Sequence, residues 1–166
     1  LVESTFTIPA DRIEAGTYLI AAAVTYGDIV IQDINATRMN NILDKLKLSG
    51  ALIETNENSI SLSMPHDSIN PVDISTAPFP GFPTDMQAQF TVLNALSIGS
   101  AVITENVFEN RFMHVQELNR MGCDITVKGS NAFVKGVNLL TGAPVMATDL
   151  RASASLILAG LCAEGE

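Results

Sequence analysis

The pattern in Asp85-Met86-Gln87-Ala88-Gln89-Phe90 appears three times in this chain of 166 residues. The other two copies are Asp11-Arg12-Ile13-Glu14-Ala15-Gly16 and Asp149-Leu150-Arg151-Ala152-Ser153-Ala154. In each copy an Asp precedes an Ala by three or four residues, and a Gly follows that Ala after 11 to 13 residues. Asp is favoured at the start of a helix and Gly just after its end. The sequence therefore predicts three equivalent helices within an internal repeat.

A second block repeats with nearly the same period. The segment Leu46-Lys47-Leu48-Ser49-Gly50-Ala51-Leu52-Ile53 parallels Leu118-Asn119-Arg120-Met121-Gly122-Cys123-Asp124-Ile125, and each is typical of a helix end, a Gly and a strand. Gly50 and Gly122 are 72 residues apart, and the first two helix starts are 74 residues apart. Because the two measures agree, we expect one structural unit to be repeated along the chain.

Each unit is expected to contain a strand, a helix, a strand, a second helix and two final strands. The alternation of apolar and polar residues in 60–64 indicates a strand with one solvated face. Besides the three repeated helices, we predict helices at 38–48 and 113–121 and strands at 29–31, 51–54, 60–64, 72–75, 102–104, 124–128, 131–137 and 144–147. The units are expected at about 1–70, 71–138 and 139–166, the third being truncated.

Two of the repeated helices are apolar on nearly every side, at 19–24 and 156–163. A helix of this kind is usually buried. The hairpin strands and the second helix of each unit are half polar, so they suit an outer layer. We therefore predict an α/β domain whose repeated helices lie together at the centre with their starts near one another.

Composition and charge exclude several classes of protein. Hydrophobic residues make up 47% and charged residues 16% of the chain, which argues against disorder. Nine Lys and Arg face 18 Asp and Glu, so a formal net charge of −9 argues against a nucleic-acid partner. No apolar run is long enough to predict a membrane span. We therefore expect neither nucleic acid nor membrane as a partner.

The termini and the two cysteines indicate cellular context. The first residues lack a basic region and an initiator Met, so we expect no signal peptide and a piece of a longer protein. Cys123 and Cys162 have neither metal-ligand spacing nor the pattern of a disulfide framework. A reducing, cytoplasmic location is expected, with no metal and no cofactor.

Four motifs resemble the UDP-N-acetylglucosamine enolpyruvyl transferases. They are Pro9–Thr17, with Ala10 as a small departure, Pro83–Gln89, Glu105–His114 and Ala147–Ala154. The resemblance follows the chain in order over nearly its whole length, and the stretch 32–41 is less typical. It implies an inside-out α/β barrel built of repeated βαβαββ units with buried central helices. It also implies a two-domain enzyme, of which this chain is most of one domain.

The resemblance implies a reaction and its partners. The family transfers the enolpyruvyl group of phosphoenolpyruvate to the 3′-hydroxyl of UDP-N-acetylglucosamine, the first committed step of peptidoglycan synthesis. The facing domain, its cysteine-bearing loop and further phosphate-binding residues are absent from this chain. Cys123 and Cys162 do not match the loop motif, so the role of the loop cysteine is not assigned to either. We expect the fragment alone to be inactive.

The site residues are also implied by the resemblance. Asp85, preceded by Thr84, is expected to contact and deprotonate the sugar hydroxyl. Asp149 is expected to take part in proton transfer to phosphoenolpyruvate, with Arg151 close to the phosphate. The alternative is a purely structural role, in which both aspartates are helix N-caps and Arg151 is a surface cation. For Asp85, capping and catalysis can coexist.

Val107, Phe108 and Arg111 complete the expected substrate-binding set. The family places the residue matching Val107 against the UDP-sugar through its backbone, whereas the alternative is that Val107 and Phe108 are strand-end core. Arg111 is expected to pair with Glu109 or Asp85.

Two other functions stay open on sequence alone. One is the shikimate-phosphate enolpyruvyl transferase, which shares the architecture but has motifs less like those present here. The other is a non-catalytic binding domain derived from the same repeat. A facing domain with a cysteine loop in the rest of the gene would favour the first reading, the UDP-sugar transferase.

Overall fold

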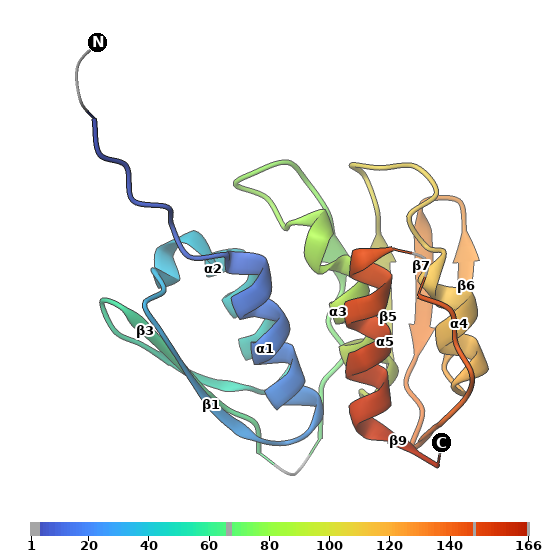
Figure 1. The fold of residues 1–166 in the computed structure, drawn as a ribbon. Helices are drawn as coiled ribbons and strands as arrows, with labels where there is room; N and C mark the ends of the chain where they lie inside the picture. Colours follow the sequence, from blue (N-terminus) through green and yellow to red (C-terminus); the bar gives the residue numbers. More distant parts are fainter. Residues whose placement is uncertain (1–3, 66–67, 148, 166) are drawn as a thin grey trace.

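The computed structural model describes residues 4–65, 68–147 and 149–165 (Figure 1). Thr148, in the last predicted motif, lies outside these ranges. The helices are α1 Arg12–Val24, α2 Asn40–Leu48, α3 Gln87–Ala95, α4 His114–Arg120 and α5 Leu150–Cys162, with short 3-10 turns η1 Ala36–Arg38 and η2 Thr84–Met86. The strands are β1 Asp28–Gln32, β2 Leu52–Thr55, β3 Ser59–Ser63, β4 Ile74–Ser75, β5 Ser100–Thr104, β6 Asp124–Lys128, β7 Asn131–Lys135, β8 Leu140–Thr141 and β9 Ala163–Glu164.

The described strands form three sheets, and the pairings in the two larger sheets are related by the repeat. The first has the order β1-β3-β2 and the second β4-β5-β7-β6. Asp28 pairs with Ser63 in the first sheet, and Ser100 pairs with Lys135 in the second. Adding 72 to 28 and to 63 gives 100 and 135, so both partners move by the period that the sequence predicts. The two sheets are therefore copies of one hairpin-based unit with one register.

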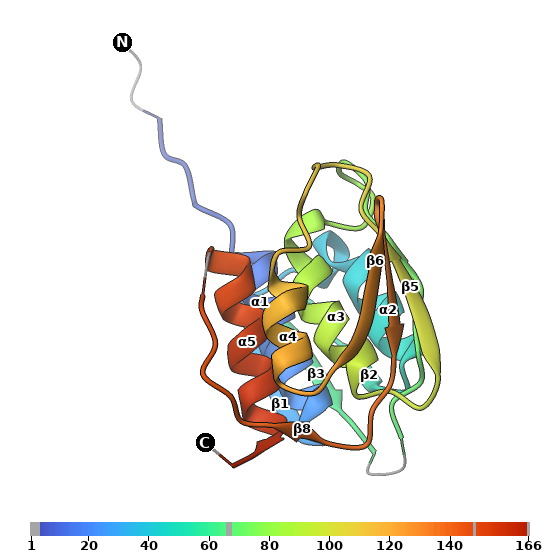
Figure 2. The ribbon, with the colours of Figure 1, turned by 90° about the vertical axis from the view of Figure 1, so that its right-hand side faces the viewer.

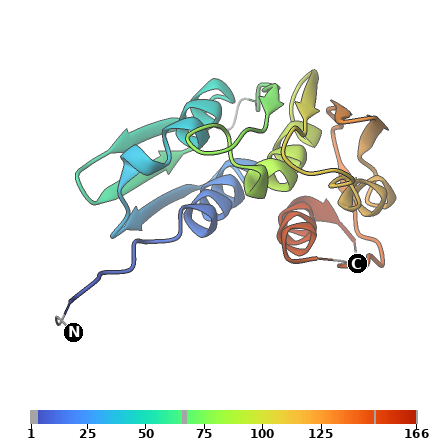
Figure 3. The same ribbon diagram turned by 90° about the horizontal axis from the view of Figure 1, so that it is seen from above.

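The three repeated helices pack against one another, as the sequence predicts. α3 contacts both α1 and α5, and these two also contact each other (Figures 1 and 3). All nine residues of α3 are buried, since α1 and α5 flank it and the strands β5 and β7 cover it. α4 packs between α5 and β6 (Figure 2). Apolar side chains from all these elements form one core cluster, which includes Leu19, Phe90 and Leu158.

Burial of α5 on all sides is a prediction that the structure corrects. Leu158 is 2% exposed, but Ile157 is 67% and Leu161 57% exposed. The reason is that α3 lies under a four-stranded sheet, whereas the one strand that follows α5 in the described chain is β9, which pairs with β8 in a sheet of only two strands. One face of α5 therefore packs on α1, α3 and α4, and its opposite face is open to solvent.

The strand expected at 144–147 is also wrong. Those residues have no regular secondary structure, and the strand before α5 is β8, at Leu140–Thr141. β8 pairs in parallel with β9, as β4 pairs in parallel with β5. The apolar run at 144–147 resembled a strand because Val and Met recur in it, but the pairing edge is formed earlier in the chain.

Candidate active site

The starts of the three repeated helices converge. Asp11 caps α1, with its carboxylate accepting from the backbone N–H of Ile13 at 2.7 Å. Asp149 caps α5, accepting from the N–H of Arg151 at 2.9 Å and of Ala152 at 3.0 Å. The pKa of Arg151 is raised, first by its hydrogen bond to Asp85 and then by the charges of Asp85, Asp149 and Asp11. One guanidinium thus lies within the field of all three aspartates.

Asp85 is bound differently from the other two aspartates. It lies in η2, ahead of α3, and its side chain makes no capping bond. Arg111 Nη2 donates to Asp85 Oδ1 at 3.0 Å, and Arg151 Nε donates to the same oxygen at 2.9 Å. The N-cap reading is therefore wrong for Asp85, because η2 carries the chain into α3 and places the carboxylate among cations.

The two oxygens of this carboxylate are not equivalent. Within the described residues Oδ1 holds both arginines, while Oδ2 has no hydrogen-bond partner. The Asp85 side chain is 31% exposed, so it is only partly covered by its neighbours. A carboxylate oxygen held in place with a free lone pair can accept a hydrogen bond from a substrate hydroxyl.

Electrostatics decide which protonation state Asp85 adopts. Burial acts to raise its pKa, but the hydrogen bonds and charges of Arg151 and Arg111 outweigh burial and lower the pKa below its ordinary value. Asp85 is therefore an ionised acceptor at neutral pH.

Thr84, Val107 and Phe108 are held by one buried carboxylate that the sequence reasoning missed, that of Glu105. Glu105 is 4% exposed and accepts from Thr84 Oγ1 at 2.8 Å. Its other oxygen accepts from Thr76 Oγ1 at 2.8 Å and from the backbone N–H groups of Val107 at 2.9 Å and Phe108 at 3.1 Å. The signal available was an acidic residue directly after a buried strand, inside a site motif.

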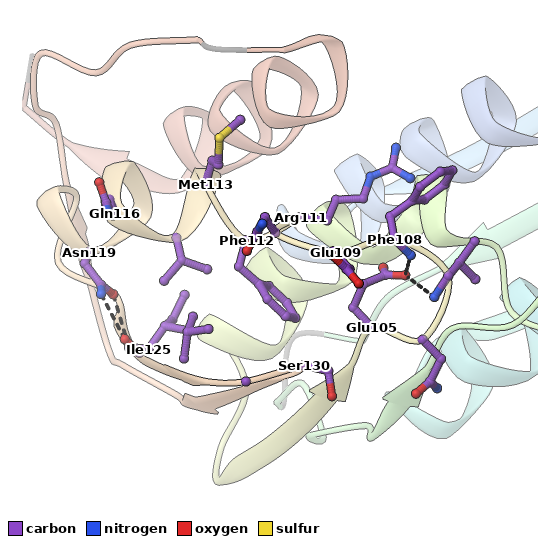
Figure 4. Close-up of a pocket in the computed structure, with 16 residues that line it drawn as sticks. Glu105, Phe108, Glu109, Arg111, Phe112, Met113, Gln116, Asn119, Ile125 and Ser130 are labelled. Carbon is purple, nitrogen blue, oxygen red and sulfur yellow. Dashed lines mark hydrogen bonds between the residues drawn. The ribbon is translucent and has the colours of Figure 1, made fainter.

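These bonds limit what Val107 and Phe108 can offer. The N–H of Val107 is already taken by Glu105, so the carbonyl is the main-chain group left for a ligand. Phe108 is 55% exposed, which contradicts a core role, and its ring lies 4.7 Å from the Arg111 guanidinium carbon (Figure 4). Of the two partners expected for Arg111, the structure selects Asp85 and not Glu109.

A groove of about 790 Å³ opens beside this cluster. The loop between β5 and α4 forms one wall, and α4 with the β6–β7 hairpin forms the other (Figure 4). Phe112, Val115 and Ile125 give it an apolar floor, and Glu105, Arg111 and Ser130 add polar groups at its margin. The shape and mixed lining are those of a small-molecule site.

Among the described residues His114 and Cys123 are buried, and Cys162 is half-buried. Burial lowers the pKa of His114 to about 4 and raises that of Cys123 to about 12. Burial also raises the pKa of Cys162, so neither thiol is a ready nucleophile. Among the described residues no His, Cys, Asp or Glu cluster is arranged to hold a metal ion. Across the same residues no helix has the length and apolar character needed to cross a bilayer.

Comparison with known proteins gives close relatives. The chain is 57% identical over 161 residues to a UDP-N-acetylglucosamine 1-carboxyvinyltransferase of Hydrogenovibrio crunogenus, which covers 97% of this chain and 38% of the relative. It is 57% identical over 160 residues to the enzyme of the same name from Coxiella burnetii, covering 96% and 37%. The chain thus spans less than two fifths of the length of these curated relatives.

Solved structures share the fold. The enolpyruvyl transferase NikO from Streptomyces tendae superposes with a TM-score of 0.84 at 27% identity, over 94% of this chain and 37% of that one. EPSP synthase from Acinetobacter baumannii gives 0.70 at 20% identity, over 95% and 40%, which is a likeness of fold alone. The family profile described as EPSP synthase (3-phosphoshikimate 1-carboxyvinyltransferase) matches residues 1–166. The chain therefore belongs to the EPSP synthase family of carboxyvinyltransferases.

Proposed function

We propose that the chain is part of a transferase that moves the enolpyruvyl group of phosphoenolpyruvate to the 3′-hydroxyl of UDP-N-acetylglucosamine. The relatives that are 57% identical over nearly the whole chain are named UDP-N-acetylglucosamine 1-carboxyvinyltransferase. The structural observation that carries the proposal is the Asp85 carboxylate, whose Oδ1 is held by two arginines while Oδ2 is free among the described residues. That oxygen is the acceptor for the proton of the sugar hydroxyl.

The other site residues have roles around this acceptor. Asp149, at the start of α5, takes part in proton transfer to phosphoenolpyruvate, and Arg151 lies at its phosphate. The helix starts favour this placement, because backbone N–H groups and dipoles there stabilise anions. Thr84 and Arg111 position the sugar side of the site, and Val107 offers its carbonyl to the UDP-sugar beside the ring of Phe108.

The rest of the protein completes the architecture. This chain is one incomplete domain of units 1–70, 71–138 and 139–166, and the whole domain is an inside-out barrel around its central helices. A second domain of the same protein faces the helix starts and encloses the two substrates between the domains. The enzyme works in the cytoplasm, in the peptidoglycan synthesis that supports cell wall biogenesis, cell shape and cell division.

The test uses the full-length protein and measures phosphate release from phosphoenolpyruvate. Release that depends on UDP-N-acetylglucosamine, with a product whose mass rises by one carboxyvinyl group, supports the proposal. Release with shikimate 3-phosphate in its place would instead identify the shikimate-phosphate sibling. Binding of the UDP-sugar without phosphate release, in a protein shown to be folded, would favour the non-catalytic binding domain.

A further inference from the structure

Glu105 is a buried carboxylate that accepts four hydrogen bonds. Four hydrogen bonds of 2.8 to 3.1 Å reach its two oxygens, from two hydroxyls and two backbone N–H groups. The donors come from three separate segments: the end of β4, the start of η2 and the loop after β5. A buried charge with this many donors is fully satisfied, and its partners are fixed in direction as well as in distance.

The hydroxyl of Thr84 transmits this order toward the site. Thr84 Oγ1 donates to Glu105 Oε2 at 2.8 Å and accepts from Arg111 Nη1 at 3.0 Å. A hydroxyl has one hydrogen, and that of Thr84 is used in the hydrogen bond to Glu105. The lone pair of Thr84 Oγ1 must then point to Arg111, whose Nη2 reaches Asp85 at 3.0 Å. The sequence of contacts is Glu105, Thr84, Arg111 and Asp85.

We propose that Glu105 is a positioning residue of the transferase: it directs the Thr84 hydroxyl so that Arg111 is held on Oδ1 of Asp85, and it clamps the backbone of Val107 and Phe108 at the sugar. The proposal rests on the function proposed above for the whole protein. Glu105 touches neither substrate in this account. Its effect is that one oxygen of Asp85 stays occupied and the other stays open.

Exchange of Glu105 for Gln changes the direction of one hydrogen bond and leaves the size of the side chain nearly unchanged. The amide of Gln has a donor NH₂ on one side, while all four present partners of Glu105 are donors. If the amide oxygen faces Thr76, Val107 and Phe108, the NH₂ faces Thr84 and donates to its Oγ1. The Thr84 hydroxyl then accepts from residue 105 and has to direct its hydrogen elsewhere. Thr84 can then no longer accept from Arg111 in the same geometry, and Arg111 loses its second anchor beside Asp85.

The experiment uses the full-length enzyme with Glu105→Gln, Thr84→Val and Thr84→Ser, and with Thr76→Val as the matched control. Thr76 bonds the other oxygen of the same carboxylate and is more deeply buried than Thr84, so Thr76→Val removes a neighbouring hydroxyl without breaking the contact with Arg111. We expect kcat to fall roughly 10²-fold in Glu105→Gln and Thr84→Val, since small misplacements of reacting groups have effects of this size. Changes in KM should stay within a few-fold. Thr84→Ser keeps the hydroxyl and should restore kcat, and Thr76→Val should lower the melting temperature and not kcat.

A double-mutant cycle with Arg111→Gln tests the route. If Glu105 acts through Arg111, adding Glu105→Gln to Arg111→Gln lowers kcat by no more than about twofold. Losses that multiply, unchanged kcat in folded Glu105→Gln, or equal kcat losses in Thr76→Val and Thr84→Val would overturn the proposal. If Glu105→Gln does not fold, the Thr84 pair and the control decide the question.

Failure of the proposed function can be told apart from failure of this inference. If the wild-type protein releases no phosphate, the proposed function is overturned, but the inference about Glu105 is not. Crystal structures of wild type and Thr84→Val then report directly on positioning. The inference stands if the contact between Arg111 and Asp85 Oδ1 is lost in the variant, and it falls if that contact is unchanged.

Discussion

At the scale of single residues, the Asp85 carboxylate shows that the two oxygens of one side chain can have different tasks. Both arginines bind Oδ1, and within the described residues Oδ2 is left without a partner. The same arginines lower the pKa of Asp85, so the group is charged at neutral pH. Since Asp85 makes no capping bond, a change in its chemistry does not remove a helix start.

This separation makes Asp85→Asn a clean test in the full-length enzyme. Asn keeps the size of the side chain and can still accept a hydrogen bond, but it cannot take up the hydroxyl proton. Turnover should fall by roughly 10²–10⁴, the usual contribution of a positioned acid–base group. UDP-sugar affinity, measured by calorimetry, should change less. Asp124→Asn, at an exposed strand position, is the control. Near-normal turnover in Asp85→Asn would remove Asp85 as the base.

Because His114 is buried, we expect the free energy of unfolding to depend on pH. Burial lowers its folded pKa to about 4 from the ordinary 6.5, so below pH 6.5 the unfolded chain binds a proton that the folded chain does not. The contribution of neutral His114 to the free energy of unfolding is fully present above pH 6.5. It declines as the pH falls toward 4, by roughly 3 kcal/mol at most. The residue 72 positions earlier is Ile42, which is also buried. His114→Ile should therefore flatten urea-unfolding free energies between pH 4 and 6.5, and an unchanged slope would contradict the prediction.

At the scale of secondary-structure elements, the features that could be predicted are those that depend on residues close together in sequence. Asp11 and Asp149 begin helices because each is an extended residue whose carboxylate accepts from the free N–H groups of the first turn, and this can be read from sequence. Asp85 has the same sequence signal, but its carboxylate is taken by arginines 26 and 66 residues away. The roles of Thr84 and Glu105 depend on contacts between distant segments in the same way. No local pattern contains such pairings, so the helices were predictable from local sequence, whereas the network was not. The exception is the pairing of Arg111 with Asp85, which was expected as one of two alternatives.

The two faces of α5 give a test within one helix. Leu158 is 2% exposed and its neighbour Ile157 is 67% exposed. Leu158→Asp should lower the free energy of unfolding by roughly 3–5 kcal/mol, because an unpaired charge would enter the core. Ile157→Asp introduces the same charge with a smaller loss of helix propensity, and it should cost about 0.5 kcal/mol. Chemical denaturation of both variants measures the difference. Equal losses would mean that the burial of α5 is described wrongly.

At the scale of the whole molecule, the site belongs to no single unit of the repeat. Asp85 and Arg111 come from the second unit, and Arg151 comes from the third. The curated relatives are more than twice as long as this chain, which covers 38% of one of them. In the proposed enzyme the facing domain supplies the rest of the phosphoenolpyruvate site.

The isolated chain of 166 residues should therefore release no phosphate from phosphoenolpyruvate, with or without UDP-N-acetylglucosamine. Holding both reactants together supplies much of the rate in a transfer reaction, and half of the enclosure is missing. Circular dichroism checks that the chain is folded, and the full-length protein is the positive control. Release by the isolated chain at a measurable rate would show that one domain suffices.

The contact between Arg151 and Asp85 also has a consequence for the repeat. It joins helix starts from two copies of the same unit, across 66 residues of chain. Within one chain such a pairing requires at least two copies of the unit in tandem, because one copy provides the carboxylate and the next provides the guanidinium. The two copies are therefore bound to each other by the site, and a change at either residue of the pair affects both.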